Sequence, residues 1–204
     1  MMARHIGALL LVLLALMIVP VTVCAETQSS AAVHVASALA SIAQFDRTHG
    51  VPDLEVALKQ LELASVGSQR SGDREKILVG YLKLFRAIDR GMPQFRPGEL
   101  PAVNVVPPKV KGVAYPSGVD PAAIPDPVAR ARYEQEIRAN DALTDRYIMA
   151  MSLRRLDKRG IVLFSAFARN AYGNSSADRN ELRRQIEQSD LTASRRSKLL
   201  KSTS

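Results

Sequence analysis

Apolar residues recur every three or four positions in the first half of the chain. This spacing, found in residues 30–49, 53–65 and 73–90, places one apolar stripe along each of three amphipathic helices. A glycine directly follows the first and third segments, where it is suited to end a helix. Because the joints between the segments are short, the pattern predicts a three-helix N-terminal unit over residues 26–90.

Residues 91–127 interrupt this periodicity. The segment holds nine of the chain's 11 prolines and four of its 11 glycines, which excludes a regular helix. Its valines and Tyr115 are too apolar for a freely solvated linker, so we expect an extended strap that lies along helix surfaces. A functional loop or hinge and a flexible linker between two domains are the alternatives.

Residues 128–204 return to helical spacing. Asp126 followed by Pro127 is typical of a helix start, and this long helix is predicted to end at Gly160. Residues 161–172 predict another helix. Two further N-cap residues predict short helices near the C-terminus: Ser175 and Thr192. The predicted fold class is therefore all-α, with two helical halves of about seven helices joined by the Pro-rich strap.

The long helix is expected to turn an apolar face toward the rest of the protein. Residues 148–153 are apolar nearly all round the helix, which places Ile148 at the buried centre. On that basis Ile148→Ala is predicted to cost about 2–5 kcal/mol of unfolding free energy. Asn140 and Thr144 interrupt this face. We expect them either to fix the register between helices or to hydrogen-bond the strap's carbonyl groups.

The first 25 residues have the pattern of an export signal. Arg4 precedes an apolar run over residues 6–19, and small to medium residues follow up to Ala25. The pattern predicts cleavage after Ala25 and a periplasmic or secreted protein. An uncleaved membrane anchor is one alternative. A lipoprotein acylated on Cys24 is another, although the bulky Val23 departs from that pattern.

The composition of the remaining chain excludes several kinds of chemistry. After residue 25 it has no Cys and no Trp, and its two histidines are His34 and His49. They lie 15 residues apart on one predicted helix, about 22 Å, so they cannot share a metal ion. No serine elbow, phosphate-binding glycine loop or zinc-binding helix motif occurs. We therefore predict no catalytic residue, metal or cofactor.

The positive charge is concentrated at the C-terminal end. Residues 26–150 have 15 basic and 15 acidic side chains, whereas residues 151–204 have 12 basic and five acidic ones. Such asymmetry favours an anionic partner, although an ordinary solvated surface is the alternative. The candidate anion- or partner-binding residues are Arg154, Arg155, Lys158, Arg159, Arg179, Arg183, Arg184, Arg195, Arg196, Lys198 and Lys201.

These patterns favour an exported, non-enzymatic helical binding protein of the cell envelope, whose partner is a protein or an anionic envelope component. One alternative is a peripheral factor that docks on an anionic membrane or polymer through the basic C-terminal third. Another is a hydrolase with dispersed acidic residues. Nucleic acid is disfavoured because few aromatic residues interleave with the basic ones. Replacing Arg195, Arg196, Lys198 and Lys201 together by Gln is predicted to weaken anion binding without unfolding the core.

Overall fold

The computed structural model describes residues 30–67, 71–110, 112 and 114–203 of the chain. The predicted export signal, residues 1–25, lies outside them. The described residues form an all-helical fold of six α-helices and one short 3-10 helix, which confirms the predicted class. None of the helices in this part of the chain is long and apolar enough to cross a membrane.

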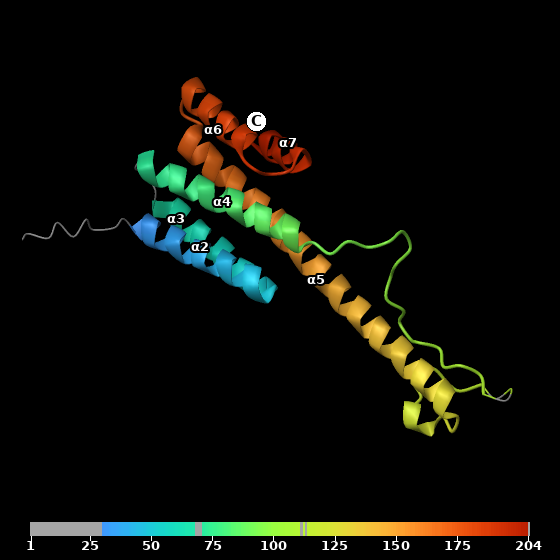
Figure 1. The fold of residues 1–204 in the computed structure, drawn as a ribbon. Coiled ribbons are helices and arrows are strands. Elements are labelled where there is room, and N and C mark those ends of the chain that lie inside the picture. The colour runs from blue at the N-terminus through green and yellow to red at the C-terminus, as the bar shows by residue number, and fades with distance from the viewer. Residues whose placement is uncertain (1–29, 68–70, 111, 113, 204) are drawn as a thin grey trace, which may run out of the picture.

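Helices α2 (Ser30–Thr48), α3 (Val51–Gly67) and α4 (Ser71–Gly91) pack side by side in the body of the molecule (Figure 1). Their apolar stripes are almost fully buried, as the spacing predicted. The joint between α2 and α3 is tight because His49 takes a left-handed backbone conformation with φ of 55°. The hydroxyl of Thr48 then donates to the carboxylate of Asp53 across the joint, at 2.8 Å.

Helix α5 (Pro127–Tyr172) is a single helix of 46 residues, about 69 Å long at helical rise. It begins as predicted, because the side chain of Asp126 accepts from the backbone N–H of Ala129 at 2.8 Å. The predicted end at Gly160 is wrong, since this glycine lies inside the helix. Two predicted helices are therefore one, and the number of α-helices in the described residues is six.

Gly160 serves close packing instead. A Cβ atom at this position would lie 3.2 Å from the ring of Phe85 on α4, which is tighter than most real contacts. Around this point, aromatic rings of α4 and α5 form the centre of the core. The ring of Tyr81 lies 5.6 Å from those of Phe164 and Phe167, and Phe85 lies 5.9 Å from Phe164. Buried aromatic pairs at such distances stabilise the helix–helix interface.

The N-terminal half of α5 leaves the body as an arm, which we define as α5 residues 127–149 together with the irregular segment 92–126 beside them (Figure 1). The segment includes the 3-10 helix η1 (Pro121–Ala123). Asn140 joins the two parts: its amide oxygen accepts from the N–H of Ala102 at 2.8 Å, and its amide nitrogen donates to the same residue's carbonyl at 3.2 Å. Of the two expected roles, Asn140 takes the hydrogen bond to a carbonyl of the segment, whereas Thr144 takes neither and donates within its own helix.

The apolar stretch at residues 148–153 is buried on one side only. Ile148 is 57% exposed and Met151 is 46% exposed, whereas Ala150 and Leu153 are buried. The predicted burial of Ile148 is therefore wrong. The physical reason is that α5 leaves the body near this point (Figure 1), so the side of the helix that carries Ile148 and Met151 stays exposed.

Helices α6 (Ser176–Gln188) and α7 (Ala193–Ser202) complete the body, and both begin with the predicted caps, Ser175 and Thr192. A buried ion-pair cluster holds α7 in place. The guanidinium of Arg195, only 8% exposed, binds the carboxylates of Asp89 on α4 and Asp157 on α5. Burial lowers the pKa of Arg195, but these two carboxylates outweigh burial and raise the pKa above its ordinary value.

The burial pattern around α5 predicts a contrast between two substitutions. Leu153→Ala should lower the unfolding free energy by about 2–5 kcal/mol, because it removes a fully buried aliphatic side chain. Ile148→Ala should change it by about 0.5 kcal/mol or less, because that side chain is exposed. Urea denaturation of the two variants measures both effects. Equal losses would show that the arm does not leave the body where the structure places it.

The ion-pair cluster predicts that Arg195 is a stability residue. Arg195→Gln should cost about 3 kcal/mol, because it leaves the carboxylate of Asp157 buried without its main partner. Lys198→Gln should cost about 1 kcal/mol or less, since the lysine is half exposed. Chemical denaturation of the two variants tests this difference, and similar small losses would contradict the buried pairing.

Candidate functional site

A basic hollow lies between α5 and α7 where the arm meets the body. Its volume is about 480 Å³. Its walls carry four cationic side chains, one carboxylate and one thioether: Arg154, Arg155, Lys158, Lys198, Asp157 and Met151. The structure thus brings together basic residues from two helices that are far apart in the sequence.

The local structure explains how these side chains meet. Arg154, Arg155 and Lys158 lie on adjacent turns of α5, on the side opposite its buried face. Lys198 comes from α7, and its ammonium lies 2.6 Å from the carboxylate of Asp157. Arg195 of α7 binds the same carboxylate from the buried side. The two ion pairs therefore hold α7 beside α5, with Lys198 at the edge of the hollow.

The electrostatics of the hollow are strongly positive. The carboxylate of Asp157 is neutralised by Arg195 and Lys198. Among the described residues, no carboxylate lies within 4.0 Å of the charged groups of Arg154, Arg155 or Lys158. Three exposed cations thus lie within two turns of one helix without a salt bridge in the described residues, and such a cluster attracts anions.

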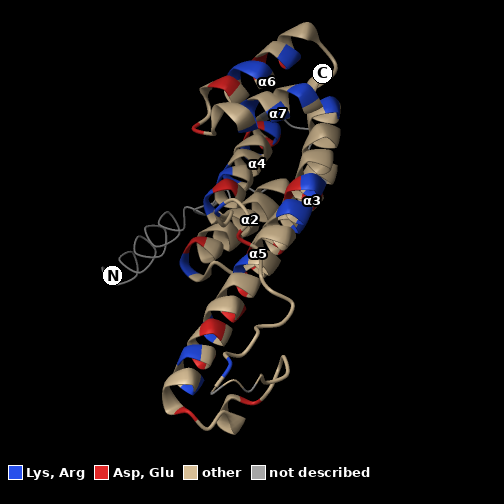
Figure 2. Cartoon of the chain, turned by 90° about the vertical axis from the view of Figure 1, so that its right-hand side faces the viewer, with Lys and Arg blue, Asp and Glu red and all other residues tan. Residues whose placement is uncertain are grey.

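The other candidate residues lie elsewhere. Several are engaged by the protein's own groups: Arg159 with Glu62, Arg184 with Glu181, Arg179 with the carbonyl of Gly173, Arg196 with the carbonyls of Ser189 and Leu191, and Arg195 with Asp89 and Asp157. Arg183 and Lys201 are exposed on α6 and α7. Figure 2 shows Lys and Arg on α6 and α7, with Asp and Glu among them on α6, and both signs of charge alternating along the lower part of α5.

The burial of Arg195 changes how the basic region has to be tested. Replacing Arg195, Arg196, Lys198 and Lys201 together removes a buried arginine that holds α7. The burial of Arg195 therefore argues against the expectation that this replacement leaves the core intact. Charge alone gave no sign of this, because the partners Asp89 and Asp157 lie 106 and 38 residues away in the sequence.

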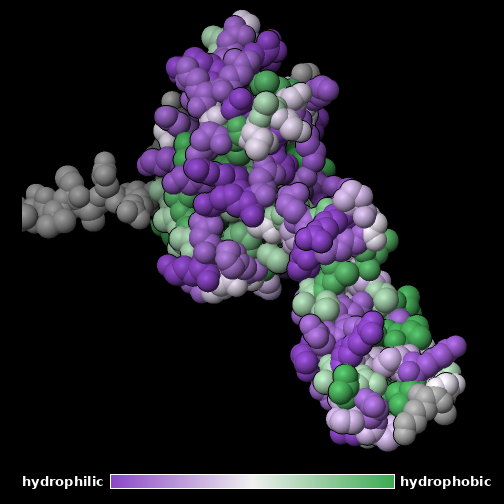
Figure 3. Space-filling model, turned by 45° about the vertical axis from the view of Figure 1, so that its right-hand side comes forward, coloured by the Kyte–Doolittle hydropathy of each residue, from purple (hydrophilic) through white to green (hydrophobic). Residues whose placement is uncertain are grey.

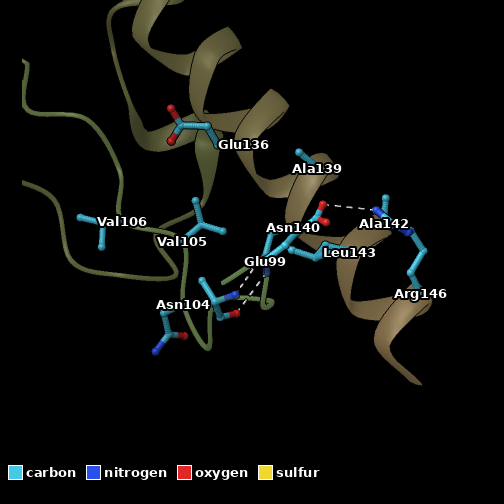
Figure 4. A pocket seen from close by; sticks show the side chains of 11 residues that line it. Glu99, Asn104, Val105, Val106, Glu136, Ala139, Asn140, Ala142, Leu143 and Arg146 are labelled. Atoms are coloured by element: carbon cyan, nitrogen blue, oxygen red, sulfur yellow. Dashed lines mark hydrogen bonds and ion pairs between the residues drawn. The ribbon is translucent and has the colours of Figure 1, made fainter. Parts of the chain in front are cut away.

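A second hollow, not foreseen from the sequence, lies in the arm between α5 and segment 99–106, with a volume of about 660 Å³ (Figure 4). Small apolar groups and the Asn140 amide form much of its wall. Its two carboxylates are paired, Glu99 with Arg146 at 3.4 Å and Glu136 with Arg132 at 3.1 Å. The backbone N–H of Arg96 is the main cause that lowers the pKa of Glu99 below its usual range, and Arg146 adds to it.

A smaller hollow of about 330 Å³ lies between the two along α5. It is lined by Phe95 and Tyr147 among others, and shares Glu99 with the arm hollow and Arg154 with the basic hollow. The guanidinium of Arg146 lies 5.1 Å from the centre of the Phe95 ring. The three hollows therefore follow one another along α5: the arm hollow has paired charges in its wall, and the hollow beside the body has unpaired cations.

The histidines and acidic residues form no metal site in the described part of the chain. His34 lies 2.7 Å from the side-chain oxygen of Gln60, within hydrogen-bond distance between α2 and α3. Across the residues that the structure places, no group of three or more His, Cys, Asp or Glu side chains is arranged to hold a metal ion.

Comparison with known proteins adds no relative from which a role could be transferred. No protein-family model matches this chain, and searches of the curated proteins and of the solved structures find no significant match. The basic hollow and the arm therefore have to be interpreted from their own geometry and charge.

Proposed function

We propose that this protein is an exported, non-enzymatic helical binding protein that docks on an anionic component of the cell envelope through the basic hollow. One observation carries the proposal: Arg154, Arg155 and Lys158 lie together in a hollow without a carboxylate partner among the described residues. In this proposal, residues 1–25 are a cleaved export signal that delivers the protein to the periplasm or the outside of the cell.

The residue types in the hollow suit phosphate and similar anions. A guanidinium presents a planar set of donors that matches a phosphate or carboxylate, and a lysine adds a mobile point charge. Phe164, Phe167 and Tyr172 are buried in the core, and the rings beside Arg154, those of Phe95 and Tyr147, pack edge to face against each other, so no row of open rings is offered for stacking with bases. This supports a lipid, polymer or acidic protein as partner rather than nucleic acid.

The state of the acidic residues supports binding over hydrolysis. A general acid needs a carboxyl group whose pKa is raised toward neutrality. In the arm hollow, hydrogen bonding and Arg146 lower the pKa of Glu99 instead. Asp157 in the basic hollow is held by two cations. Each of these carboxylates is paired with a cation of the protein. The groups of the basic hollow that remain available to a ligand are therefore its cations.

The irregular segment 92–126 completes the proposal as a strap that stiffens the arm. Asn140 holds Ala102 through two hydrogen bonds, Arg130 donates twice to the carbonyl of Ile124, and the hydroxyl of Tyr133 reaches the carbonyl of Val105 at 3.4 Å. Through these contacts the segment covers one side of α5 residues 127–149, the part of the helix that extends beyond the body. The arm would then present its remaining side at a fixed angle to the body.

The strap hypothesis predicts slow proteolysis within the segment. Asn140→Ala removes two hydrogen bonds, together about 1–2 kcal/mol, so tryptic cleavage after Lys109 should become severalfold faster. Asp141→Ala, an exposed neighbour, is the matched control and should leave the rate unchanged. Mass spectrometry of the timed digests measures both. Rapid cleavage of the wild type, with no effect of Asn140→Ala, would show a free linker instead.

The anion-docking hypothesis predicts a site-specific loss of binding. The triple variant Arg154→Gln, Arg155→Gln and Lys158→Gln should bind vesicles containing anionic phospholipid about 100-fold more weakly, since each cation near such a surface contributes about 1 kcal/mol. Binding of the wild type should also disappear in about 1 M salt, where the Debye length is about 3 Å. Co-sedimentation measures both effects.

The control for this experiment carries the same change in charge at another place. Arg179→Gln, Arg183→Gln and Arg184→Gln alter three exposed residues of α6 that do not line the basic hollow. This variant should lose much less binding. Equal losses in the two variants would assign binding to net charge alone. Absence of wild-type binding to anionic vesicles, polyphosphate and purified envelope polymer at low salt would refute the proposed function.

A further inference from the structure

Exposed apolar side chains lie directly among the free cations of α5. Tyr147 is 36%, Ile148 57%, Met151 46% and Val162 67% exposed. At 100° per residue, these four positions fall within about 120° of the helix circumference, and this arc also contains the cations of the basic hollow. We call this surface the α5 docking face, and its members are Tyr147, Ile148, Met151, Arg154, Arg155, Lys158 and Val162.

The docking face is free of negative charge. Between Asp145 and Asp178 the sequence contains a single acidic residue, Asp157. Asp157 is 8% exposed, and its carboxylate is held by Arg195 and Lys198. The face therefore combines unpaired cations with large apolar groups over about 22 Å of helix, without an exposed carboxylate of its own.

This composition differs from that of the neighbouring surface. Figure 3 shows hydrophobic side chains gathered on the arm and where it joins the body, beside a largely hydrophilic body surface. On the arm itself the helix carries both signs of charge, with ion pairs such as Arg132 with Glu136 and Arg138 with Glu134. Along α5, apolar groups mixed with cations alone are thus confined to the stretch from Tyr147 to Val162.

We propose that the α5 docking face rests on an anionic phospholipid bilayer. Its apolar side chains enter the interfacial region, and its arginines and lysine bind lipid phosphates. This inference rests on the proposed function and names the anionic partner. A soluble polyanion would satisfy the cations, but it offers no apolar medium for Ile148, Met151 and Val162. A bilayer interface offers both, and helical faces with this composition lie in the interface plane.

The binding is shallow, because only four apolar side chains are available and the buried side of α5 is committed to the core. Lys198 lies at the edge of the hollow, paired with Asp157. The ring of Phe95 packs against Tyr147 at the start of the face, with 6.3 Å between the ring centres, whereas Ile148, Met151 and Val162 remain exposed. Long basic side chains reach the phosphates while their methylene groups cover apolar surface.

The natural absence of Trp allows a direct test of depth. After Met151→Trp the chain has a single tryptophan. Its emission should shift to shorter wavelength when vesicles of mixed phosphatidylglycerol and phosphatidylcholine are added, and brominated lipid should quench it. Val128→Trp is the control, because residue 128 is 78% exposed, lies about 34 Å away along α5 and faces the other side of the helix. Its emission should not change.

Two further variants separate the apolar from the ionic contribution. Ile148→Ser with Met151→Ser replaces exposed groups and should weaken partition onto the mixed vesicles about tenfold, since affinity scales with the apolar area buried. Its binding to inorganic polyphosphate should be unchanged. The triple Gln variant of Arg154, Arg155 and Lys158 should lose binding to both probes. Circular dichroism of each variant should match the wild type.

The outcomes distinguish this inference from the proposed function. Suppose that the wild type binds polyphosphate and the mixed vesicles, but the emission of the Met151→Trp variant stays unchanged and the double Ser variant binds like the wild type. The partner is then a soluble anion or polymer, the membrane inference is wrong, and the proposed function stands. Equal binding to purely phosphatidylcholine vesicles would also overturn the inference. If the wild type binds no anionic probe, both proposals fail.

Discussion

The buried carboxylate of Asp157 is the constraint on which the arrangement of the site depends. It lies on α5 at the level where the arm leaves the body, and Arg195 connects it to Asp89 on α4. A charged pair so well buried is tolerated because hydrogen bonds satisfy both partners. The guanidinium of Arg195 also lies 5.2 Å from the centre of the Phe85 ring, so the cluster is joined to the aromatic core. Three helices are thereby fixed relative to one another.

The same cluster determines which charges remain free. The carboxylate of Asp157 is committed to Arg195 and Lys198 of α7, so it forms no salt bridge with the three cations of α5 in the same hollow. Lys198 satisfies the outer oxygen of the carboxylate and at the same time closes one wall of the basic hollow. The position of Asp157 on α5 therefore contributes both to the stability of the body and to the positive charge of the surface beside it.

Features set by nearby residues were the ones that the sequence predicted well. Asp126, Ser175 and Thr192 each cap the N–H groups of the next turn, and such bonds depend on a few adjacent positions. Asn140 was also interpreted correctly in part, because a polar residue in an apolar stripe needs a hydrogen-bond partner. The all-helical class follows from the same periodic information.

Features set by distant partners were missed. Gly160 is compatible both with a helix end and with close packing, and only the position of Phe85 decides between them. Ile148 belongs to a stretch that is apolar all round, but periodicity does not reveal where a helix leaves its neighbours. In the sequence Arg195 cannot be told from an arginine on the surface. Its burial depends on two carboxylates that are distant in sequence. Charge asymmetry thus located the region of the site, whereas the choice of residues required the fold.

The residues of the α5 docking face are not explained by the needs of the fold. Arg154 and Lys158 are four residues apart, and like charges at that spacing destabilise a helix by a few tenths of a kcal/mol. Ile148, Met151 and Val162 expose large apolar groups that contribute little to the core. We therefore attribute the exposed apolar groups and unpaired cations of this face to a contact outside the chain, and their combination sets the chemistry of that contact.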